Sequence, residues 1–191
     1  MDGWKLLLTA QELDDMVTKV AKKIDLVCVG RELVLVCILK GSAYFTVDLS
    51  RELTIKHTIE FVRAKSYDGQ KRKALSLTQH DLNPADFEGK KVVLVDELLD
   101  SGHTLLGIKS VFLEFMKPED IMTCVAMDKK LTDDKEKVLE ADIVGMDVPD
   151  VWLVGYGLDD HGYYRNSRNV YAVPKKDGLP KTKDDILVFG E

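Results

Sequence analysis

The chain has little cysteine, and the three cysteines that it contains are far apart in the sequence. Cys28, Cys37 and Cys124 include no pair at the Cys-x-x-Cys spacing that is typical of metal and redox sites. Each of them lies among apolar residues. We therefore expect three buried, reduced thiols in a cytoplasmic protein and no disulfide framework.

The chain also lacks long apolar runs. The longest stretches, such as Leu33–Leu39, cover a few residues, whereas a membrane-spanning helix needs about 20. The N-terminal residues show neither a basic start nor a long apolar run. We therefore expect no secretory signal and no membrane partner.

An excess of basic residues is missing as well. The sequence has 33 acidic and 27 basic residues, which gives a formal net charge of −6. Proteins that bind nucleic acids usually carry a basic surface, so we expect no nucleic-acid partner. The balance still allows a local basic site for a phosphorylated ligand.

What the chain does have is enough apolar material for one core. It contains 191 residues, of which 45% are hydrophobic. A single domain of this size can bury a sizeable core without disulfides or metal ions to stabilise it. We expect one domain over residues 1–191.

Helical and strand patterns alternate along the chain. Thr9 and Glu12 form a capping-box pattern before apolar residues that recur at helical spacing up to Ile24. The continuous apolar run Leu33–Leu39 fits a strand that is covered on both faces. Further strands are expected over His57–Arg63, Val92–Val95, Ile121–Met127, Val151–Val154 and Val170–Val173, and further helices over Ala43–Leu53 and over a segment with the apolar face Leu105, Ile108, Val111, Phe112 and Phe115.

This alternation predicts an α/β fold, with a mostly parallel twisted sheet flanked by helices. The polar stretch from Ala64 to Asn83 has no sustained period. A loop of this length in a compact domain is often a lid or a disordered segment.

The most informative segment runs from Val92 to Thr104. An apolar strand ends in Asp96 and Glu97, and Asp100 precedes a Ser-Gly-x-Thr turn that opens a helix. Ligands of open α/β sheets bind beyond the carboxyl ends of the strands, and the start of a helix suits a phosphate. Carboxylates repel a phosphate but suit sugar hydroxyls or a metal ion. The segment therefore predicts a sugar-phosphate site, and the alternative is a simple capped helix with surface acids.

This segment resembles the phosphoribosyl-pyrophosphate signature of the type I phosphoribosyltransferases. Other segments are similar to the hypoxanthine(-guanine) phosphoribosyltransferases within that family. The resemblance covers nearly the whole chain and lies in residues 39–42, 64–67, 96–104, 127–129, 154–159 and 164–165.

The resemblance implies a core domain with a small hood. The core would cover roughly 30–147 and 168–175, and the hood roughly 1–29 and 148–191. It implies that a purine salvage enzyme transfers a phosphoribosyl group from phosphoribosyl pyrophosphate to hypoxanthine, and also to guanine. Its alternatives are a phosphoribosyltransferase that prefers xanthine and a non-catalytic phosphoribosyl-pyrophosphate-binding regulator. Relatives form dimers and tetramers, so a homodimer or homotetramer is expected.

The resemblance also assigns roles to residues. Asp100 would accept the proton from N7 of the purine. The ribose and the 5′-phosphate would be held by Asp96, Glu97, Asp100, Ser101, Gly102, His103 and Thr104. Relatives usually have Glu-Asp where this chain has Asp96-Glu97, and they often have Lys in place of His103.

A second group of residues would bind the pyrophosphate. Lys40, Gly41 and Arg165 would contact it, and the peptide before Lys40 is cis in the family. Ser42 replaces a glycine of many relatives. Ser66 and Tyr67 would begin a mobile loop that closes over the reaction and excludes water.

The purine would contact Lys129 through O6, Trp152 by stacking, and Leu153 and Asp159 through their backbones. Without the resemblance, Trp152 fits a core aromatic and Lys129 an exposed lysine at a strand end. The implied cofactor is Mg²⁺, with Asp96 and Glu97 as ligands of one ion and Asp159 as a ligand of a second. Asp160 competes with Asp159 by composition.

Overall fold

The computed structural model describes residues 3–66, 75–77, 82–131 and 136–173. Tyr67, most of the predicted mobile loop and the residues after 173 lie outside this part of the chain. The elements are β1 (Lys5–Leu8), α1 (Ala10–Val27), β2 (Leu33–Leu39), α2 (Ala43–Glu52), β3 (His57–Ser66), β4 (Leu75–Leu77), β5 (Lys91–Leu99), α3 (His103–Val111), β6 (Asp120–Lys130), β7 (Ile143–Pro149), β8 (Trp152–Val154) and β9 (Val170–Val173).

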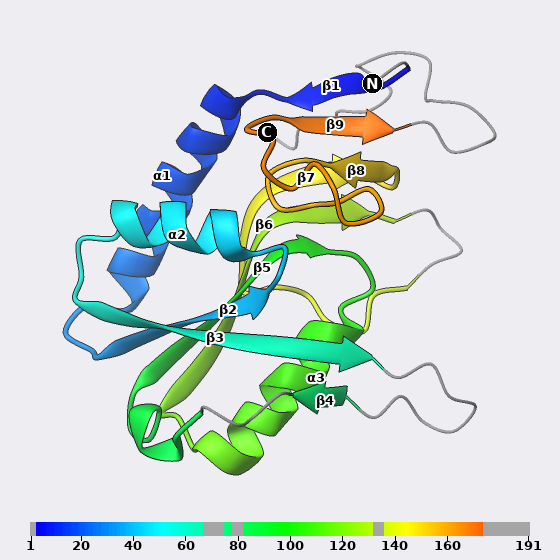
Figure 1. Cartoon of the computed structure of the whole chain (residues 1–191). Coiled ribbons are helices and arrows are strands. Elements are labelled where there is room, and N and C mark those ends of the chain that lie inside the picture. Colours follow the sequence, from blue (N-terminus) through cyan, green and yellow to red (C-terminus); the bar gives the residue numbers. More distant parts are fainter. Residues whose placement is uncertain (1–2, 67–74, 78–81, 132–135, 174–191) are drawn as a thin grey trace.

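The main sheet has the strand order β4-β3-β2-β5-β6-β7 (Figure 1). Strands β3, β2, β5, β6 and β7 run parallel, and only β4 is antiparallel to its neighbour β3. The predicted mostly parallel sheet is therefore confirmed. Its parallel strands end at one edge, where their last residues come close together.

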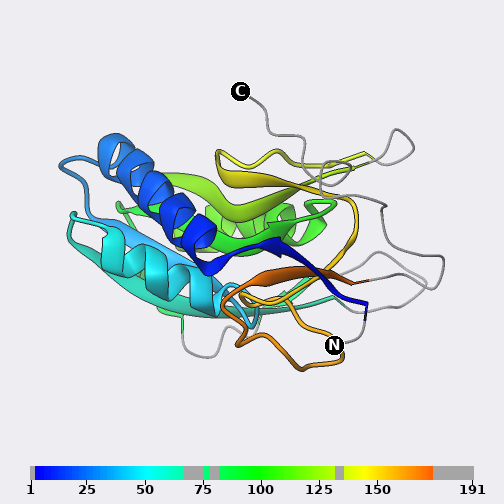
Figure 2. The same cartoon turned by 90° about the horizontal axis from the view of Figure 1, so that it is seen from above.

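Helices cover both faces of the sheet. Helices α1 and α2 pack on one face, and α3 packs on the other (Figure 2). Successive residues of β2 face opposite clusters: Leu35 packs with α1 and α2, whereas Val34 and Val36 pack on the side of α3. Burial on both faces explains the continuous apolar run of this strand.

A second, three-stranded antiparallel sheet has the order β1-β9-β8. It lies at the top of the molecule in Figure 1, where β1 leads into α1. The sequence-based division assigned residues 168–175 to the core and 1–29 to the hood. In the structure β9 pairs with β1 and β8 in the small sheet, and α1 packs against α2 and β7.

The capping box at the start of α1 is confirmed. The Glu12 backbone N–H donates to Thr9 Oγ1 at 3.2 Å, and the Thr9 backbone N–H donates to Glu12 Oε2 at 2.8 Å. The three cysteines are free and buried, as expected. In the described part of the chain, no helix is long and apolar enough to cross a membrane.

The sequence patterns missed the strands β1, β4 and β7. Strand β7 reads Ile-Val-Gly-Met-Asp-Val-Pro, in which glycine and aspartate interrupt the apolar run. A Cβ on Gly145 would overlap Met16 of α1, so the glycine allows the helix to approach this strand closely. The irregular pattern therefore has a packing cause.

The helix after Gly102 also differs from its predicted form. Regular helix ends at Val111, and a π-helical turn follows over Phe112–Met116, where Lys117 N donates to Phe112 O at 3.2 Å. The wider turn changes the helical spacing. Phe112 is buried, but Phe115 is 52% exposed, so its assignment to the buried face was wrong.

Candidate active site

A tight turn connects β5 to α3. Gly102 has φ +83°, a left-handed conformation that glycine adopts without the strain of a Cβ. The carbonyl of Gly102 accepts from Leu106 N at 2.9 Å, and Gly102 offers no side chain to cap the helix. The first N–H groups of α3 therefore face the turn, as in anion sites at helix N-termini.

The predicted phosphate residues surround this turn. Ser101 is half-buried, and His103 and Thr104 are exposed at the first helical positions. The turn is supported from outside, because Val138 N donates to the Ser101 carbonyl at 2.9 Å. The His103 and Thr104 side chains are thus accessible to a ligand.

Asp96 and Glu97 form a half-buried acidic pair near the end of β5. Burial and the neighbouring Glu97 carboxylate raise the pKa of Asp96 well above its ordinary value. The Glu97 N–H donates to Asp96 Oδ1 at 3.0 Å, which opposes this rise only partly. Two carboxylates this close together repel each other, and a cation or hydroxyl donors between them would relieve the repulsion.

The Glu97 side chain lies against the loop after β2. A Cβ added to Gly41 would overlap the Glu97 carboxylate, so the carboxylate fills the space that a side chain there would need. Lys40 is exposed, and the Leu39–Lys40 peptide is cis, as the resemblance implied. Ser42 is buried and donates to the Ile38 carbonyl at 2.7 Å.

The segment after β8 closes against the same loop. Gly157, with φ +100°, packs on the Gly41 carbonyl with no room for a Cβ. The Arg165 guanidinium donates to the Gly157 carbonyl at 2.6 Å and pairs with the Asp159 carboxylate at 2.5 Å. The Asp159 carboxylate also accepts from Gly162 N at 2.7 Å. Lys40, Gly41, Arg165 and Asp159 are therefore brought into one region.

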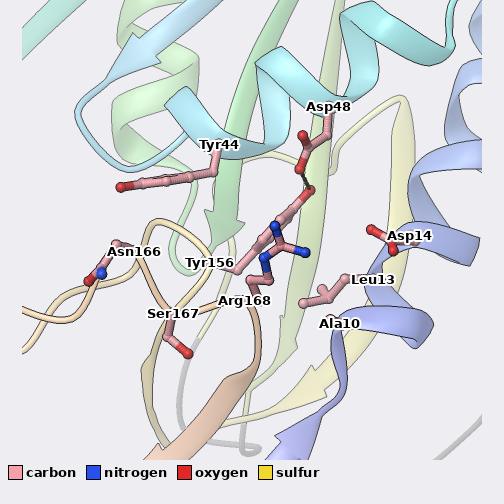
Figure 3. A pocket seen from close by; sticks show the side chains of 9 residues that line it. All are labelled: Ala10, Leu13, Asp14, Tyr44, Asp48, Tyr156, Asn166, Ser167 and Arg168. Atoms are coloured by element: carbon pink, nitrogen blue, oxygen red, sulfur yellow. Dashed lines mark hydrogen bonds between the residues drawn. The ribbon is translucent and has the colours of Figure 1, made fainter.

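A hollow of about 310 Å³ lies behind this segment, between the start of α1 and α2 (Figure 3). In it, the Tyr156 hydroxyl donates to Asp48 of α2 at 3.0 Å. Burial, followed by the charge of Asp48, raises the pKa of Tyr156. None of the predicted site residues lines this hollow. The hydrogen bond between Tyr156 and Asp48 connects the segment after β8 to α2.

Asp100 and Lys129 meet beside the acidic pair. Lys129 Nζ donates to Asp100 Oδ2 at 3.1 Å. The Lys129 side chain is 10% exposed and that of Asp100 is 57% exposed. The interpretation of Lys129 as an exposed strand-end lysine is therefore wrong, because the strand that carries it is buried between β5 and β7.

Trp152 begins β8 and is 50% exposed, whereas its neighbour Leu153 is buried. The core-aromatic interpretation of Trp152 is therefore wrong. Successive residues of a strand point to opposite sides, and the side of Trp152 faces outward. Ser66 ends β3, opposite Leu75 of β4.

One residue beside the site was not predicted. Asp150 follows β7, and its Oδ1 lies 3.8 Å from Lys129 Nζ. The sequence signal that could have revealed it is an acid at the end of a strand next to that of Lys129. It was missed because β7 itself was not predicted.

The donor set fits Mg²⁺ only in part. Within the described ranges, no group of three or more His, Cys, Asp and Glu side chains gathers as a metal cage. Mg²⁺ usually takes one or two carboxylates together with water and substrate phosphates, so the pair Asp96 and Glu97 fits one such ion. Asp159 is already paired with Arg165, which leaves its carboxylate less available.

Comparisons with known proteins agree with this arrangement. A family model described as phosphoribosyl transferase domain matches residues 3–161. A hypoxanthine-guanine phosphoribosyltransferase of Aquifex aeolicus is 41% identical, over 88% of this chain and 94% of its own length. A hypoxanthine phosphoribosyltransferase of Salmonella typhimurium is 35% identical, over 72% of this chain and 75% of its own length.

A solved structure is also similar. The crystal structure of a hypoxanthine-guanine phosphoribosyltransferase from Bacillus anthracis matches with a TM-score of 0.79 at 34% identity, and the match covers 88% of this chain and 98% of the other. The sheet order, the turn before α3 and these similarities define the class of protein. The chain belongs to the phosphoribosyl transferase family.

Proposed function

We propose that the protein transfers the 5-phosphoribosyl group of phosphoribosyl pyrophosphate to hypoxanthine and guanine, in purine salvage. The products would be the nucleoside monophosphate IMP or GMP and pyrophosphate. The observation that carries the proposal is the meeting of three features at the ends of the parallel strands. These are the left-handed glycine turn before α3, the acidic pair of β5 and the Asp100–Lys129 ion pair. The hypoxanthine and hypoxanthine-guanine phosphoribosyltransferases among its relatives support the choice of substrate.

The first step is the binding of the phosphoribosyl group. Backbone N–H groups at the start of α3, together with the Ser101 and Thr104 hydroxyls and His103, would hold the 5′-phosphate. Asp96 and Glu97 would accept hydrogen bonds from the ribose hydroxyls. The half-buried position of this pair supports the role, because a carboxylate gains most from an additional donor where water is scarce.

The leaving pyrophosphate would lie over the Lys40–Gly41 loop. Lys40 is exposed there, and Gly41 keeps the backbone free of a side chain. A guanidinium has five N–H donors, so Arg165 keeps donors for phosphate oxygens beyond those used on Gly157 and Asp159. These cationic groups would stabilise the negative charge that develops on the leaving group.

The purine would lie between Trp152 and the Asp100–Lys129 pair. Trp152 would stack on the ring, and the Leu153 and Asp159 backbones would contact its edge. Lys129 would donate to O6, which favours a 6-oxopurine over adenine because an ammonium cannot accept from an amine. Asp100 would take the proton from N7 as N9 of the purine bonds to ribose C1 and the C1–pyrophosphate bond breaks.

We propose Mg²⁺ as the cofactor. Asp96 and Glu97 would bind one ion, and Asp159 would be a ligand of a second ion. When bound, the ion neutralises phosphate charge and brings the carboxylates and the polyanionic substrate together. Trp152 would still bind the base by stacking, and Asp100 would still accept its proton.

We also propose a cytoplasmic homodimer or homotetramer. The three buried, free cysteines support a reducing compartment. Light scattering after size-exclusion chromatography measures the oligomeric state directly. A monomer at micromolar concentration would contradict this part of the proposal.

One assay tests the function. The purified protein is mixed with phosphoribosyl pyrophosphate and Mg²⁺ and is given hypoxanthine, guanine, xanthine or adenine in turn. We expect turnover of hypoxanthine and guanine and none of adenine. A preference for xanthine would correct the substrate. Binding of phosphoribosyl pyrophosphate without turnover of any base would favour a regulator.

A further inference from the structure

Lys129 lies between two carboxylates that come from the two neighbouring strands. Its Nζ is 3.1 Å from Asp100 Oδ2, after β5, and 3.8 Å from Asp150 Oδ1, after β7. The sheet register explains the juxtaposition. Leu99, the last residue of β5, pairs with Asp128 of β6, and Pro149, the last residue of β7, pairs with Lys130 of β6. Asp128 and Lys130 are the neighbours of Lys129 in the chain. Asp100 and Asp150, which follow Leu99 and Pro149, therefore lie on either side of Lys129.

The two carboxylates differ in their surroundings. The Asp100 side chain is 57% exposed, whereas that of Asp150 is 9% exposed and that of Lys129 is 10% exposed. Asp100 therefore has space to turn towards a ligand. Asp150 is held in place by the protein around it.

Two other acids of this region, Asp128 and Asp147, have other partners. Asp128 pairs with Lys130 at 3.6 Å and with Lys137. Lys130 also pairs with Asp147 at 2.9 Å. Asp100 and Asp150 are thus the carboxylates within 4 Å of the Lys129 ammonium in the described part of the chain.

The proposed reaction separates Asp100 from Lys129. Asp100 must turn to the purine N7, and it becomes neutral when it takes the proton. A buried ammonium that loses its counter-ion is costly, and it would either lose its own proton or move away from the base. The site therefore needs an anion that stays beside Lys129 throughout the reaction.

We propose that Asp150 is a positioning residue that holds the Lys129 ammonium at the purine O6 while Asp100 serves N7. This inference rests on the proposed function. In the free protein, both carboxylates share the ammonium. With the base bound, Asp150 alone keeps Lys129 charged and oriented, so that Asp150 contributes to the selection of 6-oxopurines without touching them.

The test replaces Asp150 by asparagine, which keeps the shape and removes the charge. For Asp150→Asn, we expect the KM for hypoxanthine to rise about tenfold, which is about 1.4 kcal/mol. We expect kcat to change less and the KM for phosphoribosyl pyrophosphate to stay the same. Unsubstituted purine has no 6-oxo group, so its inhibition constant should not change. A purely structural role would raise the KM for hypoxanthine and the inhibition constant of purine together, and that result would overturn the inference.

Two controls make the test specific. Asp147→Asn removes a neighbouring carboxylate that pairs with the half-exposed Lys130, and it should leave all constants unchanged. In a double-mutant cycle with Lys129→Gln, the Asp150→Asn change should have no further effect on the KM for hypoxanthine. The double variant removes both charges of the Lys129–Asp150 pair, so it keeps the test open if Asp150→Asn alone fails to fold. If Asp150→Asn raised the KM for hypoxanthine equally in the wild type and in Lys129→Gln, the inference would be overturned.

Failure of the inference differs from failure of the proposed function. If the wild-type protein turns over no base, the proposed function falls, and the role of Asp150 in it falls too. If the wild type turns over hypoxanthine and Asp150→Asn has the wild-type KM, only the inference falls.

Discussion

Gly157 packs directly on the carbonyl oxygen of Gly41, 116 positions earlier in the chain, and the contact leaves no room for a Cβ. It joins the segment that carries Asp159 and Arg165 to the loop that carries Lys40. The proposed pyrophosphate site depends on this contact, because its cationic residues come from both segments.

Replacement of Gly157 by alanine tests this contact. Gly162→Ala is a matched control, because Gly162 also has a left-handed φ, +89°, but nothing within 4 Å of an added Cβ. We expect the control to lose about 1–2 kcal/mol of unfolding free energy from backbone strain alone. Gly157→Ala should lose about 1–3 kcal/mol more from overpacking and should raise the KM for phosphoribosyl pyrophosphate. Denaturant unfolding and steady-state kinetics measure these effects, and equal losses in both variants would contradict the role of the contact.

Asp100→Asn tests the proton acceptor. Asparagine can still accept from Lys129, but it cannot take a proton from the purine. We expect kcat to fall by about 10²–10⁴, with little change in the affinity for phosphoribosyl pyrophosphate. A kcat equal to that of the wild type would remove Asp100 from this role.

Trp152→Ala tests the stacking surface. Half of this side chain is exposed, so its removal should cost little stability. The loss of stacking should weaken base binding by about 1–3 kcal/mol, which is visible as a higher KM for hypoxanthine. Trp152→Phe should recover most of the affinity. Phe115→Ala removes another half-exposed aromatic ring, in the π-helical turn after α3, and an equal rise in KM there would show that the effect is not specific.

Asp142→Asn tests a charge that supports the fold away from the proposed site. Burial by itself would raise the pKa of Asp142, but hydrogen bonds from Thr123 N and Oγ1, at 2.7 and 2.8 Å, and the nearby Lys109 ammonium outweigh it and lower the pKa. We expect the variant to lose about 1 kcal/mol at neutral pH, a low value because the carboxylate is 42% exposed and screened by water.

The pH dependence of that loss follows from the sign of the shift. A carboxyl group whose pKa is lower in the folded state contributes its full stability above the unfolded pKa of about 3.9. The contribution disappears as the pH falls through the folded pKa. The difference between wild type and Asp142→Asn should therefore be constant near neutrality and shrink below about pH 4. Asp15→Asn, on the exposed side of α1, is the control for the loss of a surface carboxylate, and it should cost less unfolding free energy at neutral pH than Asp142→Asn.

The sequence alone determined the elements whose patterns are local. The capping box of α1, the continuous apolar run of β2 and the glycine turn before α3 depend on residues a few positions apart, so they could be predicted. Strand β7 could not, because its glycine reflects contact with Met16 on a distant helix. The position of Phe115 depended on a change of helical period that no local pattern marks.

The same distinction applies to the site. The run from Asp96 to Thr104 would supply most of the proposed chemistry from consecutive residues, and a local sequence pattern predicted it. Only the tertiary structure placed Asp150 beside Lys129, because the two residues meet through the register of β6 and β7. Side-chain burial also needed the fold: Lys129 proved to be buried and Trp152 exposed, since both depend on what packs around the ends of their strands.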